Sequence, residues 1–169
     1  MDPKIHVIDN FLDYPDIVRK SALSLNYPLT GNYPGRRSLP ADSSYQRMIH
    51  DKLESIFHQP VFFTDEDESF CFQICLEGSE TWAHTDLTEW AGVLYLTPNA
   101  PAESGTGFYT MLDDLPILNS FVANVYNRLI LYRGNIMPHA SLLAGFGDSV
   151  KNGRLTQVFF FNTYERSDK

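Results

Sequence analysis

From residue 61 onward, the sequence is a succession of short apolar stretches separated by glycine, proline and asparagine. These stretches lie at 61–64, 69–76, 90–97, 106–111, 122–134, 137–146 and 154–164. Many short strands separated by turn residues are typical of a β-sandwich or barrel. We therefore predict a mainly β fold with flanking helices. Residues 61–169 would form the core of a jelly roll, a cupin-like double-stranded β-helix of antiparallel sheets.

The part of the chain before residue 61 shows a different pattern. Residues 4–9 alternate as in a short strand, and apolar residues recur at helical spacing within 14–25 and again within 43–58. Residues 26–40 are rich in proline, glycine and asparagine, which predicts a loop. Because the sequence has no repeat, low-complexity tract or linker, we expect a single domain over 1–169, with the two N-terminal helices covering one sheet.

The charge and the cysteines narrow the class of protein. The formal net charge is −8, so a nucleic acid would have to bind against the net field, and we expect no such partner. No apolar run approaches the roughly 20 residues needed to cross a bilayer, and the N-terminus lacks the pattern of a signal peptide.

Cys71 and Cys75 would lie roughly 13 Å apart on a strand, too far for a disulfide. Free thiols favour a cytoplasmic protein, and no pattern indicates an oligomeric state.

His84 and Asp86 are separated by a single residue. On a strand, residues i and i+2 point to the same face, so both side chains can reach one ion. Imidazole and carboxylate suit Fe(II), Mn(II) or Zn(II), and two histidines with one carboxylate leave positions open for substrate and O₂. His139 is the candidate for the second histidine, because it follows an expected strand and a Gly-Asn turn. The remaining histidines are expected at the surface, namely His6, His50 and His58.

Arg154 begins the last apolar stretch, and Thr156 shares its face of the expected strand. The other face carries Leu155, Gln157, Phe159 and Phe161. An arginine among aromatic residues is costly to bury unless it meets an anion. Its planar guanidinium suits a carboxylate, and Thr156 can add a hydroxyl donor. The alternative is a surface Arg154 that pairs with an acid such as Asp148.

This ordered set of residues resembles the H-x-D…H…R-x-[S/T] signature of the Fe(II)- and 2-oxoglutarate-dependent oxygenases, and in particular their prolyl-hydroxylase-like branch. The segment GVLYLTPNAPAESGTGFY is similar to the one that follows the H-x-D strand in that branch. NRLILYRGNIMPHAS resembles the strand and turn that carry the distal histidine, and IHVIDNFLDYPDIVRKSAL resembles the opening strand and helix. The resemblance covers nearly the whole chain.

The resemblance implies a double-stranded β-helix that binds Fe(II) through His84, Asp86 and His139. It implies that 2-oxoglutarate chelates the iron and that its distal carboxylate pairs with Arg154, assisted by Thr156. It further implies an enzyme that uses O₂ to hydroxylate a substrate C–H bond while 2-oxoglutarate is decarboxylated to succinate.

The chain departs from the branch just before H-x-D. CLEG stands near the place where that branch usually has a tyrosine in contact with the co-substrate. We expect Tyr95 or Gln73 to supply this contact instead.

The sequence leaves the substrate open among a peptidyl side chain, a free amino acid and another small metabolite. Arg36 and Arg37 lie either near the mouth of the barrel or in a solvated loop. Trp82 and Trp90, which flank the metal motif, either wall a pocket or pack in the core or rim. An alternative function is that of a cupin-like metal protein, such as a metal-dependent isomerase or hydrolase that does not use 2-oxoglutarate. A further alternative is a non-catalytic binding module.

Overall fold

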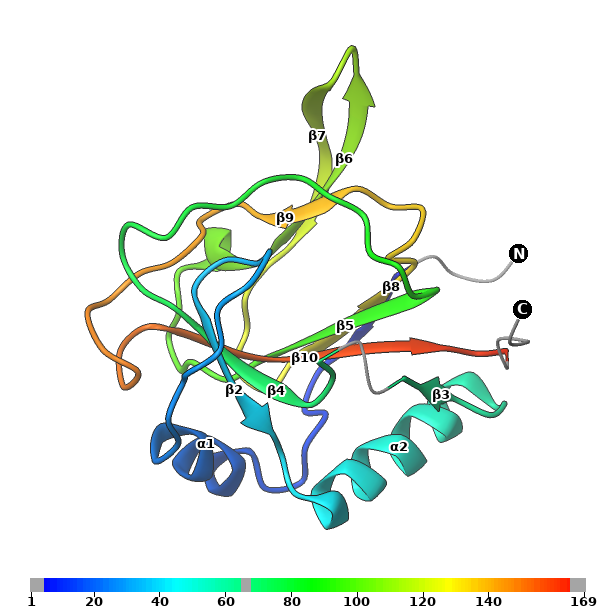
Figure 1. Cartoon of the computed structure of the whole chain (residues 1–169), viewed down its shortest axis with the longest axis vertical. Helices are drawn as coiled ribbons and strands as arrows, with labels where there is room; N and C mark the ends of the chain where they lie inside the picture. The colour runs from blue at the N-terminus through cyan, green and yellow to red at the C-terminus, as the bar shows by residue number, and fades with distance from the viewer. Residues whose placement is uncertain (1–4, 65–67, 165–169) are drawn as a thin grey trace.

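The computed structural model describes residues 5–64 and 68–164 (Figure 1). In chain order, the elements are β1 (Ile5–Ile8), α1 (Pro15–Leu23), β2 (Arg36–Pro40), α2 (Ser43–Phe57), β3 (Phe62–Phe63), β4 (Cys71–Cys75), β5 (Trp90–Tyr95), a 3₁₀ turn (Ala102–Ser104), β6 (Thr106–Leu112), β7 (Leu115–Val122), β8 (Leu129–Tyr132), β9 (His139–Ser141) and β10 (Arg154–Asn162). The prediction of a mainly β chain with two N-terminal helices is confirmed.

The strands form two antiparallel sheets. The larger sheet has the order β1-β8-β5-β10-β4-β2, with β3 paired to β10, and the smaller has the order β7-β6-β9. Both helices lie against one face of the larger sheet, and the smaller sheet lies over the other face (Figure 1). The chain is therefore layered, and the space between the two sheets is where distant segments meet.

Helix α2 shows how the local sequence sets this arrangement. The carboxylate of Asp42 accepts hydrogen bonds from the backbone amides of Ser44 and Tyr45, both at 3.0 Å, and so caps the first turn. Ile49 and Leu53, four residues apart, are fully buried and face the sheet. The cap fixes where the helix begins, and the apolar face fixes which side is buried.

Strand β10 crosses the middle of the larger sheet and has two different faces. Leu155, Phe159 and Phe161 are buried in the main core beneath the helices. Arg154 and Thr156 point into the space between the sheets, where they line a cavity. The alternation predicted from the sequence is therefore confirmed, and it separates an apolar layer from a polar one.

The prediction of a continuous loop over 26–40 is wrong at its end, because Arg36–Pro40 forms β2 at the edge of the larger sheet. Arg36 pairs with Ile74 and Arg37 with Gln73. The proline and glycine content of this segment hid a strand whose pairing depends on its neighbour β4 rather than on its own propensity.

Strand β7 was not predicted at all. It pairs with β6 to form a hairpin that projects from the molecule (Figure 1). Seven of its eight residues are exposed, so no buried face imposes a period-two pattern on its sequence. The predicted stretch 122–134 accordingly divides into the last residue of β7, a turn, and β8.

The three histidines that were expected at the surface lie in different surroundings. His6 is not a simple surface residue, because its ring packs 5.3 Å from that of Phe57 and 5.5 Å from that of Trp90. His50 is half-buried, and His58 is exposed as expected.

The cysteines and the helices bear on two further predictions. Cys71 and Cys75 are both free, as predicted, and both are buried. Within the described residues, no helix combines the length and the apolar character required to span a membrane.

Candidate metal centre and cavity

His84, Asp86 and His139 meet at one end of the cavity. The backbones of His84 and His139 form an antiparallel bridge, with N–H···O distances of 3.1 Å and 2.9 Å. The Asp86 backbone amide donates to the Gly134 carbonyl at 2.9 Å, which brings the Asp86 carboxylate close to both imidazoles. One potential ligand atom from each residue lies within 4.8 Å of the others. The three side chains singled out in the sequence are thus brought together.

The orientation of the two imidazoles suits a metal ion. Nδ1 of His84 lies 3.0 Å from the Trp82 carbonyl oxygen, and Nδ1 of His139 lies 2.8 Å from that of Met137. A carbonyl can only accept, so both Nδ1 atoms carry a proton, and in the neutral imidazole this leaves Nε2 as the atom with a lone pair for a metal. These Nε2 atoms lie 3.6 Å and 3.2 Å from the Asp86 carboxylate oxygens.

The carboxylate supports the same conclusion. Oδ2 of Asp86 is buried and has no hydrogen-bond partner among the described residues. Ligand atoms about 2.1 Å from one ion and at right angles to each other are about 3 Å apart, close to the separations seen here. The donor set therefore fits a divalent metal ion held on one face by two imidazoles and one carboxylate.

Tyr132 supports the metal end and was not singled out from the sequence. Its ring lies 4.5 Å from that of His139 and 5.2 Å from that of Phe108. Burial, and next the nearby Asp86 carboxylate, raise the pKa of Tyr132 well above its ordinary value. The signal that could have identified it is the alternation within β8, where Tyr132 shares the inner face with Ile130.

Arg154 lies in the inner wall of the cavity, 5% exposed. Its Nε donates to the Ser104 carbonyl at 2.7 Å, and its guanidinium lies 5.9 Å from the centre of the Tyr95 ring. Neither Nη has a hydrogen-bond partner among the described residues. The alternative of a surface pair with Asp148 is wrong, because Arg154 is buried and Asp148 instead accepts from the Asn152 amide at 2.8 Å.

A row of polar residues crosses the larger sheet beside Arg154. Arg37 is paired with Gln73, Gln73 with Thr156, and Thr156 with Tyr95. Residues directly opposite each other on antiparallel strands point to the same face, so all four side chains face the smaller sheet. The Tyr95 hydroxyl lies 2.7 Å from the Thr106 hydroxyl, and Gln73 accepts from Arg37 at 2.8 Å. Burial raises the pKa of Tyr95.

The cavity has a volume of about 430 Å³, within the range of small-molecule sites. It joins the metal end to the polar row, since its lining includes His84, Asp86, His139, Arg154, Thr156 and Arg37. Gln73 also lines it, whereas Tyr95 lies behind Thr106, which does. The wall of this cavity therefore offers a ligand the three candidate metal ligands and two guanidinium groups.

The two arginines and two tryptophans whose roles the sequence left open lie in different surroundings. Trp90 is buried in the main core on the opposite face of the sheet, whereas Trp82 is 41% exposed with its ring 6.4 Å from that of His84. Arg36 is exposed and donates to two backbone carbonyls of the preceding loop. Arg37 lies inside the cavity. Of the two adjacent arginines, only the one on the inward face of β2 is in a position to contact a ligand.

Comparison with known proteins gives matches in structure only. No family model matches the chain, and no curated protein matches its sequence. The fold is similar to that of a prolyl-4-hydroxylase from Pseudomonas putida, with a TM-score of 0.60 and 17% identity over 96% of this chain and 94% of that one. It is similar to HygX from Streptomyces hygroscopicus, solved with nickel and 2-oxoglutarate bound, with a TM-score of 0.67 and 14% identity over 94% and 82% of the two chains.

A third solved structure has the same overall arrangement. It is a prolyl hydroxylase from Trichoplax adhaerens in complex with a hypoxia inducible factor oxygen degradation domain peptide, with a TM-score of 0.60, 12% identity and coverage of 95% and 84%. At these identities the likeness establishes a shared fold, and the chemistry has to be argued from the site itself.

Proposed function

We propose that this chain is an Fe(II)- and 2-oxoglutarate-dependent oxygenase that hydroxylates a C–H bond, built as one double-stranded β-helix domain. The observation that carries the proposal is that one cavity contains both a cluster of two histidines and one carboxylate and a buried arginine. The Nη groups of this arginine, Arg154, make no hydrogen bond to any described residue. The solved structures of similar fold support it, because HygX was solved with a metal and 2-oxoglutarate bound.

In this proposal His84, Asp86 and His139 hold the iron. The carbonyl bonds to both Nδ1 atoms keep the imidazoles in the tautomer that binds a metal through Nε2. Iron bound there supplies oxygen activation coupled to the decarboxylation of 2-oxoglutarate to succinate.

Arg154 binds the distal carboxylate of 2-oxoglutarate. The Ser104 carbonyl fixes Nε, which leaves the Nη groups to donate to an anion in the cavity. Thr156, two residues along the same face of β10, adds a hydroxyl donor beside it. This arrangement selects a co-substrate with a carboxylate at each end.

The alternative of a metal-dependent isomerase or hydrolase is less well supported. Such an enzyme would use the same three ligands, but it would leave Arg154 as a buried cation without an anion. Uncompensated burial of a charge costs several kcal/mol. The arginine therefore favours the oxygenase.

The test is the formation of the anaerobic complex with Fe(II) and 2-oxoglutarate, followed by its weak visible charge-transfer band. We expect the band in the wild-type protein and in the matched control His58→Ala, whose side chain is exposed and outside the cavity. We expect no band in His139→Ala. A wild-type protein without the band, or an unchanged band in His139→Ala, would contradict the proposal.

A further inference from the structure

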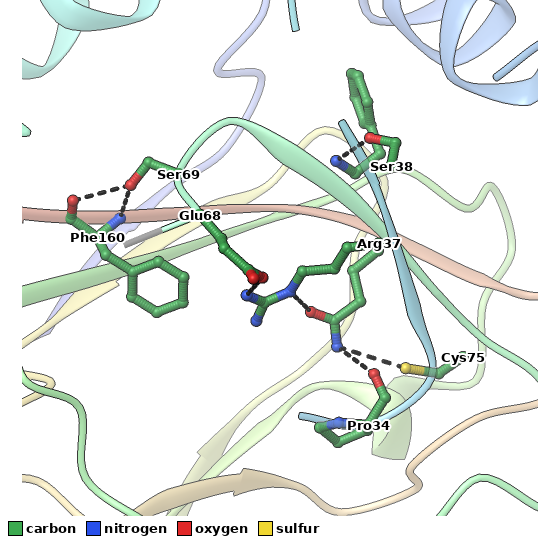
Figure 2. A network of polar contacts seen from close by, with 9 residues as sticks. Pro34, Arg37, Ser38, Glu68, Ser69, Cys75 and Phe160 are labelled. Carbon is green, nitrogen blue, oxygen red and sulfur yellow. Dashed lines mark hydrogen bonds and ion pairs between the residues drawn. The ribbon is translucent and has the colours of Figure 1, made fainter. Parts of the chain in front are cut away.

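Arg37 lines the cavity, and Figure 2 shows the polar contacts that hold its side chain in place. Its Nε donates to the Gln73 side-chain oxygen at 2.8 Å, and the Gln73 amide in turn donates to the Pro34 carbonyl at 2.9 Å. The guanidinium lies 3.7 Å from the centre of the Tyr33 ring and 5.5 Å from that of Phe160. A side chain that packs against two aromatic rings and donates a hydrogen bond from Nε is preorganised to bind a ligand with its remaining donors.

Glu68 completes this cluster. Its carboxylate accepts from Nη1 of Arg37 at 3.0 Å, as Figure 2 shows. The two side chains differ in exposure, since that of Arg37 is 9% exposed and that of Glu68 is 43% exposed. Nη2 of Arg37 makes no hydrogen bond to any described residue. The pair therefore presents one open cationic edge and one accessible carboxylate, side by side.

We propose that Arg37 and Glu68 bind the α-carboxylate and the α-ammonium group of a free amino acid, which is the substrate class of this enzyme. The inference rests on the proposed function and specifies its substrate. An anion alone would be attracted by Arg37 and repelled by Glu68, and a cation alone would meet the reverse. A zwitterion satisfies both charges and leaves neither member of the pair unmatched.

The cavity provides room for a second small molecule. Its two arginines lie on different strands, Arg37 on β2 and Arg154 on β10, with β4 between them. Each can therefore bind a different carboxylate, Arg154 that of 2-oxoglutarate and Arg37 that of the substrate. The volume of about 430 Å³ has to hold both molecules, which favours a free amino acid over a larger metabolite.

The first experiment measures succinate formed from 2-oxoglutarate by the Fe(II)-loaded protein, with each of the twenty proteinogenic L-amino acids as probe. We expect at least one to stimulate the reaction above its basal rate. The primary amide and the N-acetyl derivative of that amino acid, which lack one of the two charges, should stimulate it far less. Stimulation by none of the twenty, or equal stimulation by the amide, would overturn the inference.

Variants then test the residues themselves. Arg37→Met should raise the KM for the stimulating amino acid by about tenfold or more, because it removes a charge-assisted contact. The matched control Arg36→Met removes the exposed neighbour and should leave that KM unchanged. Glu68→Gln removes the negative charge of a half-exposed side chain and should reduce the preference for the amino acid over its N-acetyl derivative. An unchanged KM in Arg37→Met would refute the role of Arg37. An unchanged preference in Glu68→Gln would refute the role of Glu68.

The charge-transfer band separates this inference from the proposed function. If the wild-type protein forms the 2-oxoglutarate complex and no amino acid stimulates turnover, only the substrate assignment fails. If the complex does not form, the proposed function fails and the substrate assignment fails with it.

Discussion

Replacing Arg154 with methionine tests the proposed 2-oxoglutarate site most directly. The substitution keeps a long, flexible side chain in the wall of the cavity and removes the buried guanidinium. In the ligand-free protein two effects oppose each other, because the Ser104 carbonyl loses its partner while a buried cation without an anion disappears. We therefore expect little change in the melting temperature without ligand.

The effect on 2-oxoglutarate binding should be large. The two Nη groups can form two charge-assisted hydrogen bonds to a carboxylate, each contributing about 1.5–3 kcal/mol, so the loss is about 3–6 kcal/mol. This corresponds to an affinity roughly 150-fold to 25,000-fold weaker. At a 2-oxoglutarate concentration about 1,000 times the wild-type Kd, the stabilisation by ligand should fall from about 4 kcal/mol to about 1 kcal/mol or less.

The assay is thermal unfolding with nickel(II) and increasing concentrations of 2-oxoglutarate. For a domain of this size, the wild-type shift should be about 8–16 °C and that of the variant about 4 °C or less. Arg36→Met, which removes an exposed arginine, should shift like the wild type. An Arg154→Met variant that is stabilised as much as the wild type would refute the proposed role of the guanidinium.

Three other predictions follow from the described geometry. His139→Ala should lose metal after reconstitution and desalting, because only two of the three candidate ligands remain. Elemental analysis measures the bound metal, and retention at the wild-type level would count against the triad. Tyr95→Phe removes the 2.7 Å bond to Thr106 and should lower the free energy of unfolding in urea by about 1–2 kcal/mol, whereas the exposed control Tyr14→Phe should not. Burial raises the pKa of the Cys71 thiol from 9.0 to about 11, so the unfolded chain releases this proton first and stability falls as the pH rises from 9 to 11. The stability difference between the wild type and Cys71→Ala should therefore narrow by up to about 2.7 kcal/mol over that range, and a constant difference in pH-dependent urea unfolding would contradict it.

The sequence predicted those parts of the fold in which a buried face imposes a period on the residues. Helix α2 and strand β10 have such faces, and both were found from their spacing. Strand β2 depends on pairing with β4, and β7 is exposed along nearly its whole length, so neither has a pattern of its own. Long-range pairing decides such segments, and a single sequence does not contain it in readable form.

The residues of the candidate site also divide into those recognisable from the sequence and those placed by strand pairing. His84, Asp86, His139 and Arg154 were identified because their residue types and order suggest chemistry. Arg37 was left undecided, because the loop character assigned to its segment gave no indication of which arginine faces inward. Its position is a consequence of the register with Gln73, which only the structure supplies.

The two ends of the cavity differ in how firmly they are built. Arg154 lies on a nine-residue strand that pairs with neighbours on both sides, so its position follows from the core of the sheet. His84 and Asp86 lie outside the named strands, and their backbones are joined to the facing segment by two hydrogen bonds between His84 and His139 and one from Asp86 to Gly134. Segments with few backbone bonds open at a lower free energy than central strands. The Arg154 end of the cavity is therefore preformed. A bound metal ion would contribute to ordering the other end, because it would join two segments whose backbones share only these hydrogen bonds among the described residues.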